Sequence, residues 1–390
     1  MRTMDLHAQR QPEQSEAPWL WEIFCKVIDN FGDVGVCWRL SADLAARGHT
    51  VRLWLDDPQA LAWMAPGALQ GRWPGVSVWA WAQASNPHVL QALAPAQVWV
   101  ESFGCELPTE FVAARANQVD QVSQPVWINL EYLSAEVFVD RCHGLPSPVM
   151  SGPAHGWTKH FFYPGFTPHT GGLLRESTLT ELRQAFGGAE RKAFLQGLDL
   201  EDRGETLVSL FCYDGAPVKL LLEQLRAATR PVHLLVTAGK ARAQVERMLA
   251  QTTHGPGRLR VSYLPLLSQA EFDPLLWSCD LNFVRGEDSL VRALWAGQPF
   301  VWQIYPQDDG AHRAKLGAFL GVIDAPKAVR DWHAQWNGMA PWSSVAPLSP
   351  DEVKTWRDWA QASQQRLARQ SDLTSQLIAF VAGRLTPKKA

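Results

Sequence analysis

The segment from Cys279 to His312 constrains the fold of this chain more than any other stretch. It reads CDLNFVRGEDSLVRALWAGQPFVWQIYPQDDGAH. Its pattern predicts a short buried strand over Cys279–Val284, a polar turn, a helix over Ser289–Ala296 ended by Gly297, and a second strand over Gln298–Tyr305. A strand, a glycine-containing turn and a helix start form an anion site, because the first-turn amides are unpaired and the helix dipole favours negative charge.

An ordinary capped helix is the alternative explanation of the turn. In that case Asp288 or Ser289 is the N-cap and Arg285 pairs with Glu287. Polar and aromatic residues around the end of the next strand favour a ligand site, since strand ends of a parallel sheet share one crevice. These residues are Gln303, Tyr305, Gln307, Asp308, Asp309 and His312.

A similar unit opens the chain. An apolar run over Glu22–Ile28 predicts the first strand, and the turn DNFGDVG follows it. Apolar residues then recur at Val36, Leu40 and Leu44, the spacing of one helix face, and Thr50–Leu55 is the next strand. This order is typical of a doubly wound nucleotide-binding domain, but the turn lacks the GxGxxG pattern and does not support a dinucleotide.

Two carboxylates, Asp29 and Asp33, flank that first turn at the predicted carboxyl end of the strand. Chemistry is usually placed at this end of a parallel sheet. Asp29 is equally compatible with a turn-forming role and Asp33 with a helix N-cap. Spacing alone leaves both possibilities open.

The rest of the first half predicts three more strands, over Val76–Trp79, Gln97–Glu101 and Val126–Leu130, and helices near 87–94 and 109–117. We interpret the polar end of the last strand, Asn129–Leu133, as an ordinary strand exit. Residues 144–175 are rich in proline, glycine and aromatics and predict a long loop and hinge. Its histidines match no metal-ligand spacing, so no metal site is expected.

A second α/β series follows a helix near 178–187. It alternates strands and helices, which predicts a parallel sheet with right-handed crossovers. The expected strands are Thr206–Phe211, Val232–Thr237, Arg258–Tyr263, Cys279–Val284 and Phe300–Tyr305, and the expected helices lie near 217–228, 240–250, 268–277, 289–296 and 311–320. We therefore divide the chain into a disordered extension (1–18), two Rossmann-like domains (19–180 and 181–348) and terminal helices that cross back to the first domain (349–390).

Composition limits the partners and the compartment. The chain has 390 residues and a formal charge of −3, which favours neither nucleic acid nor an anionic membrane surface. Its first residues lack the apolar segment of a signal peptide, and no apolar run approaches a membrane span. The six cysteines form no CxxC pair, which is typical of a reduced cytoplasmic protein.

Two facing doubly wound domains would place a ligand in the cleft between them, the arrangement of GT-B glycosyltransferases. Specific blocks sharpen this comparison. The sequence resembles the EarP family, the arginine rhamnosyltransferases of elongation factor P, in DNFGDVGVCWRLSADLAARGH, NLEYLSAE, HFFYPGFTPHTGGLLRE and LNFVRGEDSLVRALWAGQPFVWQIYPQDDGAHRAKL. The similarity extends over both domains from about residue 22 onward.

The resemblance implies an inverting enzyme that moves L-rhamnose from dTDP-β-L-rhamnose to one arginine of elongation factor P, a modification that supports translation through proline stretches. It implies neither a metal nor another cofactor. By the same resemblance Asp33 is the general base, Asp29 positions the acceptor guanidinium, and Glu287 is a third acidic group near the donor. The loop near the acceptor comprises Asn30, Phe31, Gly32 and Gly35.

The resemblance also implies a donor site built from Phe211, Tyr213, Leu266, Gln269, Phe272, Arg285, Gly286, Asp288 and Ser289. Leu266 departs from the family pattern, which has a phenylalanine stacked on thymine there. Leucine can pack on a base but lacks the aromatic face.

Two other functions remain open at this stage. One is a GT-B glycosyltransferase with another nucleotide sugar and a small-molecule acceptor. The other is a non-catalytic binder of elongation factor P or of a nucleotide, which would not need Asp29, Asp33 and Glu287 together beside an anionic donor.

Overall fold

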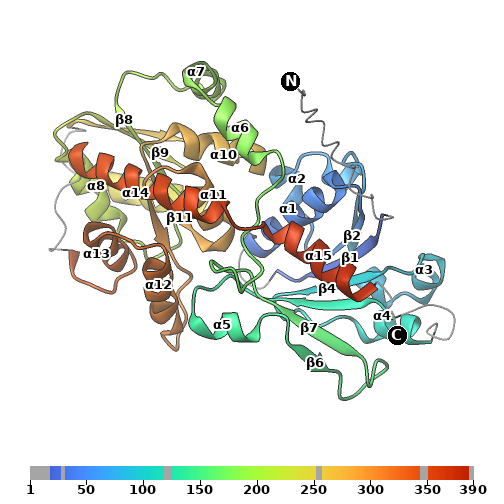
Figure 1. Ribbon diagram of the computed structural model, residues 1–390. Coiled ribbons are helices and arrows are strands. Elements are labelled where there is room, and N and C mark those ends of the chain that lie inside the picture. The colour runs from blue at the N-terminus through green and yellow to red at the C-terminus, as the bar shows by residue number, and fades with distance from the viewer. Residues whose placement is uncertain (1–17, 28–30, 118–123, 252–256, 343–349, 386–390) are drawn as a thin grey trace, which may run out of the picture.

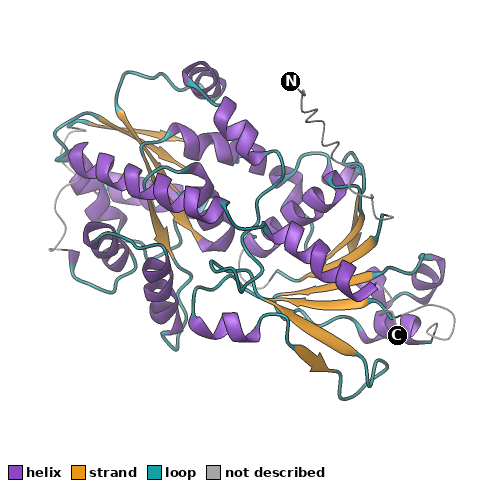
Figure 2. Ribbon diagram, in the orientation of Figure 1, coloured by secondary structure: helices purple, strands orange, loops and turns teal. Residues whose placement is uncertain are grey.

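The computed structural model describes residues 18–27, 31–117, 124–251, 257–342 and 350–385. It contains two parallel sheets, each flanked by helices on both faces, in two lobes that lie side by side (Figures 1 and 2). This architecture confirms the predicted α/β class with two Rossmann-like, doubly wound domains. All of the predicted extension except residue 18 lies outside the described residues.

The N-terminal lobe is built on a seven-stranded sheet with the order β3-β2-β1-β4-β5-β7-β6. All neighbours are parallel except β6 and β7. Its elements are β1 (Leu20–Cys25), α1 (Gly32–Ala46), β2 (Thr50–Leu55), α2 (Leu61–Met64), β3 (Val76–Ala80), α3 (Pro87–Ala92), β4 (Val98–Ser102), α4 (Thr109–Ala116), β5 (Val126–Leu130), α5 (Val137–Cys142), β6 (Pro146–Pro148) and β7 (Thr158–Phe162).

The C-terminal lobe is built on a five-stranded, wholly parallel sheet with the order β10-β9-β8-β11-β12. Its elements are α6 (Leu179–Ala185), α7 (Gly188–Gly197), β8 (Thr206–Leu210), α8 (Val218–Arg226), β9 (Val232–Val236), α9 (Lys240–Ala250), β10 (Leu259–Tyr263), α10 (Gln269–Ser278), β11 (Leu281–Arg285), α11 (Gly286–Ala296), β12 (Phe300–Gln303), α12 (Ala311–Val322) and α13 (Lys327–Trp336). Both sheets reverse their strand order beside the first strand, β1 or β8, which is where such folds bind ligands.

Residues 144–175 are more ordered than predicted. They contain β6 and β7, and β7 extends the sheet in parallel with β5. Polar residues hide this strand in the sequence, since Lys159 points to Glu101 and makes an ion pair with it at 2.9 Å. The helices α7 and α13 were also not predicted.

The chain ends with α14 (Pro350–Ala368) and α15 (Leu373–Leu385). Figure 1 shows α14 on the C-terminal lobe and α15 on the N-terminal lobe, where α15 packs against α1 and β5. The turn between them is tied to the interlobe segment 163–178, because Arg175 donates hydrogen bonds to the carbonyls of Ala368 and Gln370. The two connections between the lobes therefore support each other.

All six cysteines are free thiols, and five of them are buried. Among the described residues, no helix has the length and apolar character needed to cross a bilayer.

Candidate functional site

A cavity of about 240 Å³ lies between the lobes, at the carboxyl ends of strands from both sheets. Parallel α/β sheets bind ligands at this edge. The residues that line it are Gly32, Asp33, Tyr132, Tyr213, Gly286, Glu287, Asp288, Trp302, Ile304, Tyr305, Gln307 and Lys315. Gly32, Asp33, Tyr213, Gly286, Glu287 and Asp288 are predicted site residues, so the fold brings together groups that are far apart in the sequence.

Asp33 lies in the first turn of α1, directly after β1. The N-cap of α1 is Phe31, and no side chain caps it. The alternative of Asp33 as an N-cap is therefore wrong. Its carboxylate instead accepts a hydrogen bond from the Tyr132 hydroxyl at 3.2 Å. Asp29 and Asn30 lie outside the described residues.

Tyr132 and Leu133 follow β5 and bring the end of that strand into the cavity. The Tyr132 ring stacks on Phe103 with centroids 4.6 Å apart. Burial, together with the charges of Asp33 and Glu287, raises the pKa of Tyr132 above its usual value, so its hydroxyl stays protonated and can donate a hydrogen bond to Asp33. Tyr132 therefore lines the candidate site, a position that the interpretation of this segment as an ordinary strand exit does not include.

Glu287 lies in the first turn of α11 and bridges the lobes. One carboxylate oxygen accepts a hydrogen bond from the Leu133 amide at 2.8 Å, and the other binds the Lys315 ammonium at 2.6 Å. The Arg285–Glu287 pair expected for an ordinary capped helix is not formed within the described part of the chain. Lys315 sits inside α12, where no sequence signal marked it.

Helix α11 begins earlier than predicted, and its first residues line the cavity. The helix begins at Gly286, and its N-cap is Arg285 rather than Asp288 or Ser289. Gly286 has φ of +66°, and a Cβ there would lie 2.7 Å from the Tyr213 hydroxyl oxygen. Its carbonyl accepts a hydrogen bond from the Trp302 indole at 2.8 Å. Only glycine fits this contact without a shift of its neighbours.

Arg285, the N-cap of α11, packs against two aromatic rings that follow β8. Its guanidinium lies 4.3 Å from the centroid of the Phe211 ring and 4.7 Å from that of Tyr213, within cation–π range. Burial lowers the pKa of Arg285 and raises that of Tyr213 to about 12. The Tyr213 amide donates to the Gln303 side chain at 2.7 Å, so the ends of β8 and β12 are joined beside the cavity.

The remaining predicted residues surround this centre without lining it. Gln269 is buried and points to α1, and its side-chain amide donates to the Gly35 carbonyl at 3.0 Å. Phe272 packs edge-on against Phe211. Ser289 bonds back to the Arg285 backbone. Two are exposed at the surface, Phe31 by 43% and Leu266 by 58%.

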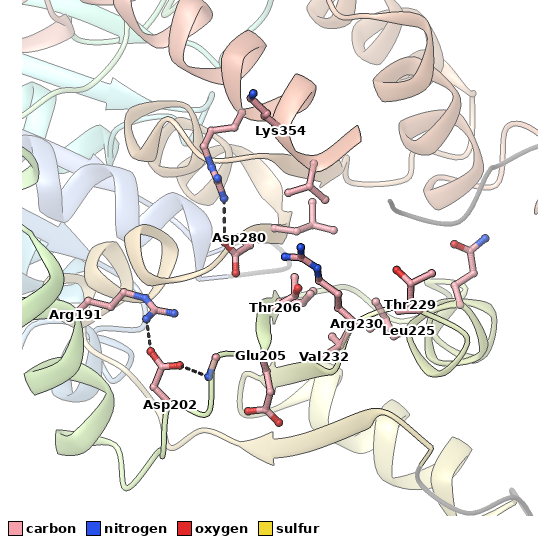
Figure 3. Close-up of a pocket in the computed structure, with 17 residues that line it drawn as sticks. Arg191, Asp202, Glu205, Thr206, Leu225, Thr229, Arg230, Val232, Asp280 and Lys354 are labelled. Carbon is pink, nitrogen blue, oxygen red and sulfur yellow. Dashed lines mark hydrogen bonds and ion pairs between the residues drawn. The ribbon is translucent and has the colours of Figure 1, made fainter. Parts of the chain in front are cut away.

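A larger cavity of about 390 Å³ lies at the opposite, amino-terminal edge of the C-terminal sheet. Figure 3 shows Arg191 paired with Asp202 there, near Thr206 and Val232, the first residues of β8 and β9. Asp280, beside β11, is held by Arg357. No predicted site residue lines this cavity, and it faces away from the switch point, so the smaller interlobe cavity is the candidate site.

The described residues contain no group of three or more histidine, cysteine or acidic side chains placed to hold a metal ion. His143 illustrates this for the histidine-rich segment. Its ring nitrogen accepts a hydrogen bond from the Tyr163 amide at 3.1 Å, which is a structural role.

Comparison with known proteins gives a consistent result over most of the chain. A family model described as "Elongation-Factor P (EF-P) rhamnosyltransferase EarP" matches residues 21–382. A relative named protein-arginine rhamnosyltransferase from Pseudomonas putida is 43% identical over 387 residues, which cover 92% of this chain and 98% of the relative. A protein of the same name from Pseudomonas aeruginosa is 41% identical, with 93% and 98% covered.

A solved structure agrees with these sequence relatives. It is described as "Structural basis for EarP-mediated arginine glycosylation of translation elongation factor EF-P" and is 31% identical, with a TM-score of 0.62. The match covers 94% of this chain and 100% of the solved one. Together with the two facing sheets, this likeness confirms the predicted GT-B type of fold.

Proposed function

This chain belongs to the EarP family of elongation factor P rhamnosyltransferases, and from that membership we propose that it transfers L-rhamnose from dTDP-β-L-rhamnose to one arginine side chain of elongation factor P. The proposal includes a cytoplasmic location, no metal and no other cofactor. The main structural observation that supports it is that Asp33 and Glu287 face one cavity from opposite lobes. Each of them lies in the first turn of a helix that follows a strand at the switch point of its sheet.

The donor would lie against the C-terminal lobe. First-turn amides of α11 favour the diphosphate, because they are unpaired donors at the positive end of the helix dipole. Lys315 adds a cation that lines the same cavity. Phe211, Tyr213 and Phe272 form an aromatic cluster beside this turn, suited to the nucleotide. As the sugar–oxygen bond breaks, these groups would stabilise the charge that collects on dTDP.

The acceptor would enter from the N-terminal lobe. A guanidinium only donates hydrogen bonds and has a pKa above about 12, so a carboxylate does not deprotonate it before reaction. Asp33 would instead orient it, and Glu287 can also accept from it, because each carboxylate oxygen has a second lone pair. Asp29 would take part in the same positioning.

The reaction is a single displacement. A guanidinium nitrogen attacks the anomeric carbon of the sugar from the side opposite dTDP, and the configuration of that carbon inverts. The new nitrogen–carbon bond forms as the carbon–oxygen bond breaks, and the bonding electron pair leaves with dTDP. The nitrogen loses its proton to Asp33 late in this step, when the developing bond has made it acidic.

Intact mass spectrometry of elongation factor P tests the proposal directly. Folded, unmodified acceptor is incubated with this protein and dTDP-L-rhamnose, and one added deoxyhexose is expected. The addition should disappear when the acceptor arginine is replaced by lysine. Asp33→Asn should abolish it on the same timescale, whereas Glu110→Gln, a first-turn carboxylate of α4 outside the cavity, should not.

The exposed Leu266 raises a second possible outcome, in which the enzyme uses a nucleotide sugar with a different base. The family pattern has an aromatic residue there, so another nucleotide base could be accepted. If no mass is added with dTDP-L-rhamnose, a screen of other nucleotide sugars with the same acceptor, and then with small-molecule acceptors, identifies a different GT-B transferase. A protein that binds elongation factor P but transfers no sugar from any donor would be a non-catalytic binder.

A further inference from the structure

The helices α1 and α11, which carry Asp33 and Glu287, pack directly against each other across the boundary between the lobes. Gly35 marks the close approach. A Cβ at this position would lie 3.0 Å from the Gln269 side-chain nitrogen and 3.2 Å from a carboxylate oxygen of Asp288. The two candidate catalytic turns are therefore held in register by contacts that leave little room.

One helical turn beyond Gly35, Arg39 projects from the same face of α1 into the C-terminal lobe. It is only 6% exposed. Its guanidinium binds Glu176 of the interlobe segment at 3.0 Å and lies 3.3 Å from Asp288 of α11. It also lies 3.6 Å from Asp273 of α10. One side chain of the N-terminal lobe thus contacts three carboxylates that lie outside it.

Arg292 of α11 completes this group. It binds Asp273 with two nitrogens, at 2.7 and 2.5 Å, and Glu176 at 2.5 Å. We call Arg39, Glu176, Asp273, Asp288 and Arg292 the interlobe ion cluster. Burial alone would raise the pKa of Glu176, but Arg292 and Arg39 lower it to about 2.

Removal of one partner from such a buried group is costly, because the charges that remain stay buried without compensation. Two cations face three carboxylates here. Arg39 is the only member from the N-terminal lobe, so it is the charge that ties that lobe to the cluster. It does not line the cavity.

Asp288 connects the cluster to the candidate donor site, since it lies in the first turn of α11. A carboxylate at this place would repel a diphosphate. Arg39 draws its side chain toward α1 and partly compensates its charge, which leaves the first-turn amides available to an anion. Burial raises the pKa of Asp288, and the charge of Arg39 opposes that rise.

We propose that Arg39 is a positioning residue that fixes α1 against α11 and thereby sets the spacing between the acceptor carboxylate Asp33 and the donor turn. The assignment of these two sites rests on the proposed function. Arg39 acts through the ion cluster and touches neither substrate. A shift of about 1 Å between reacting groups can lower turnover about a hundredfold.

Three full-length variants test this. Arg39→Met removes the charge, and it should lower kcat about a hundredfold. It should also raise KM for the donor, because Asp288 loses its partner. Gly35→Ala keeps every charge but wedges the helices apart, and it should lower kcat with little change in dTDP affinity measured by calorimetry. Arg39→Lys keeps the charge on one nitrogen and should restore part of kcat.

Arg47→Met is the matched control. Arg47 is the C-cap residue of α1 and also binds two carboxylates, Asp43 and Asp372, but it faces α15 rather than α11. Its kcat should stay within twofold of the wild type. Small-angle X-ray scattering should show a broader distribution of interlobe distances for Arg39→Met and an unchanged one for Arg47→Met.

The outcomes separate the two proposals. If folded Arg39→Met and Gly35→Ala both keep kcat within twofold and unchanged scattering, the positioning role is overturned. If Arg39→Met does not fold, Gly35→Ala decides alone by the same criterion. If the wild type transfers no sugar, the proposed function fails, and scattering still tests whether Arg39 holds the lobes.

Discussion

Replacement of Gly286 by alanine tests whether the start of α11 forms the donor site. Gly286 has φ of +66°, a conformation that alanine adopts only with strain. Its added Cβ would also lie 2.7 Å from the Tyr213 hydroxyl oxygen, closer than real Cβ contacts allow. The substitution therefore perturbs the turn in two independent ways, through its backbone and through its neighbour.

The size of each effect can be worked out from this geometry. The left-handed backbone costs alanine about 1 kcal/mol. Displacement of the Tyr213 side chain from its preferred rotamer costs about 1 kcal/mol more. If both costs are relieved by a movement of the first-turn amides away from the diphosphate, dTDP binding weakens by about 2 kcal/mol, or roughly 30-fold.

Calorimetric titration of dTDP into the wild type and three variants measures this loss. Tyr213→Phe removes the hydroxyl that the new Cβ would meet, so the double variant should bind dTDP about fivefold more tightly than Gly286→Ala, a recovery of about 1 kcal/mol. Tyr213→Phe alone reports any direct contribution of the hydroxyl. Gly338→Ala is the matched control, because Gly338 has φ of +67° and no atom within 4 Å of an added Cβ.

Gly338→Ala should lower the melting temperature without changing dTDP affinity. Two results would refute the reasoning. One is unchanged dTDP affinity of Gly286→Ala. The other is a double variant that binds no better than Gly286→Ala although Tyr213→Phe alone binds normally, which would mean that the hydroxyl contact is not the source of the cost.

Two further predictions concern the candidate site, and a third concerns a buried histidine of α13. Asp33→Asn should lower kcat by about 10²- to 10⁴-fold with unchanged dTDP affinity, and full transfer by this variant would exclude Asp33 as the base. Tyr132→Phe removes the hydroxyl that donates a hydrogen bond to Asp33. It should lower kcat about tenfold and leave KM for the nucleotide sugar unchanged. A KM for the nucleotide sugar that also rises about tenfold would contradict a role on the acceptor side alone. Burial lowers the pKa of His333 to about 4 from 6.5, so the unfolded chain binds more protons between these values and stability falls as the pH drops from 6.5 toward 4. Between pH 6.5 and 4, the melting temperature should fall more steeply with decreasing pH for the wild type than for His333→Gln. Equal slopes for the two proteins would contradict this assignment.

Much of the fold could be predicted because buried parallel strands are continuous apolar runs. The strands at 50–55 and 126–130 and the helix at 240–250 have the predicted bounds. β7 could not be recognised, since its polar residues, such as Lys159, find partners only after the sheet has formed. The start of α11 was placed three residues late, because a glycine with positive φ and two acidic residues is also typical of a turn.

Some residues of the candidate site could likewise be predicted from the sequence, and others could not. Strand order places the ends of β1, β8 and β11 at the switch points, so Asp33, Tyr213 and Glu287 could be expected in one cleft. Lys315 and Arg39 could not, because each lies within a helix and its partner belongs to a distant segment or to the other lobe. Such residues carry no local signal, since their function depends on how the lobes pack.

The charges of the cavity bear on which acceptor it suits. Three carboxylates line it, and each is held differently. Asp288 is drawn to Arg39, Glu287 is bound by Lys315, and Asp33 is held by a neutral hydroxyl. Asp33 lines the same cavity as the other two carboxylates. A planar guanidinium beside Asp33 could bind its carboxylate with two parallel hydrogen bonds from two nitrogens, whereas an ammonium has only one nitrogen to offer. The same geometry would keep the acceptor's positive charge beside the donor until the proton is lost, and this favours arginine over lysine as the side chain that is modified.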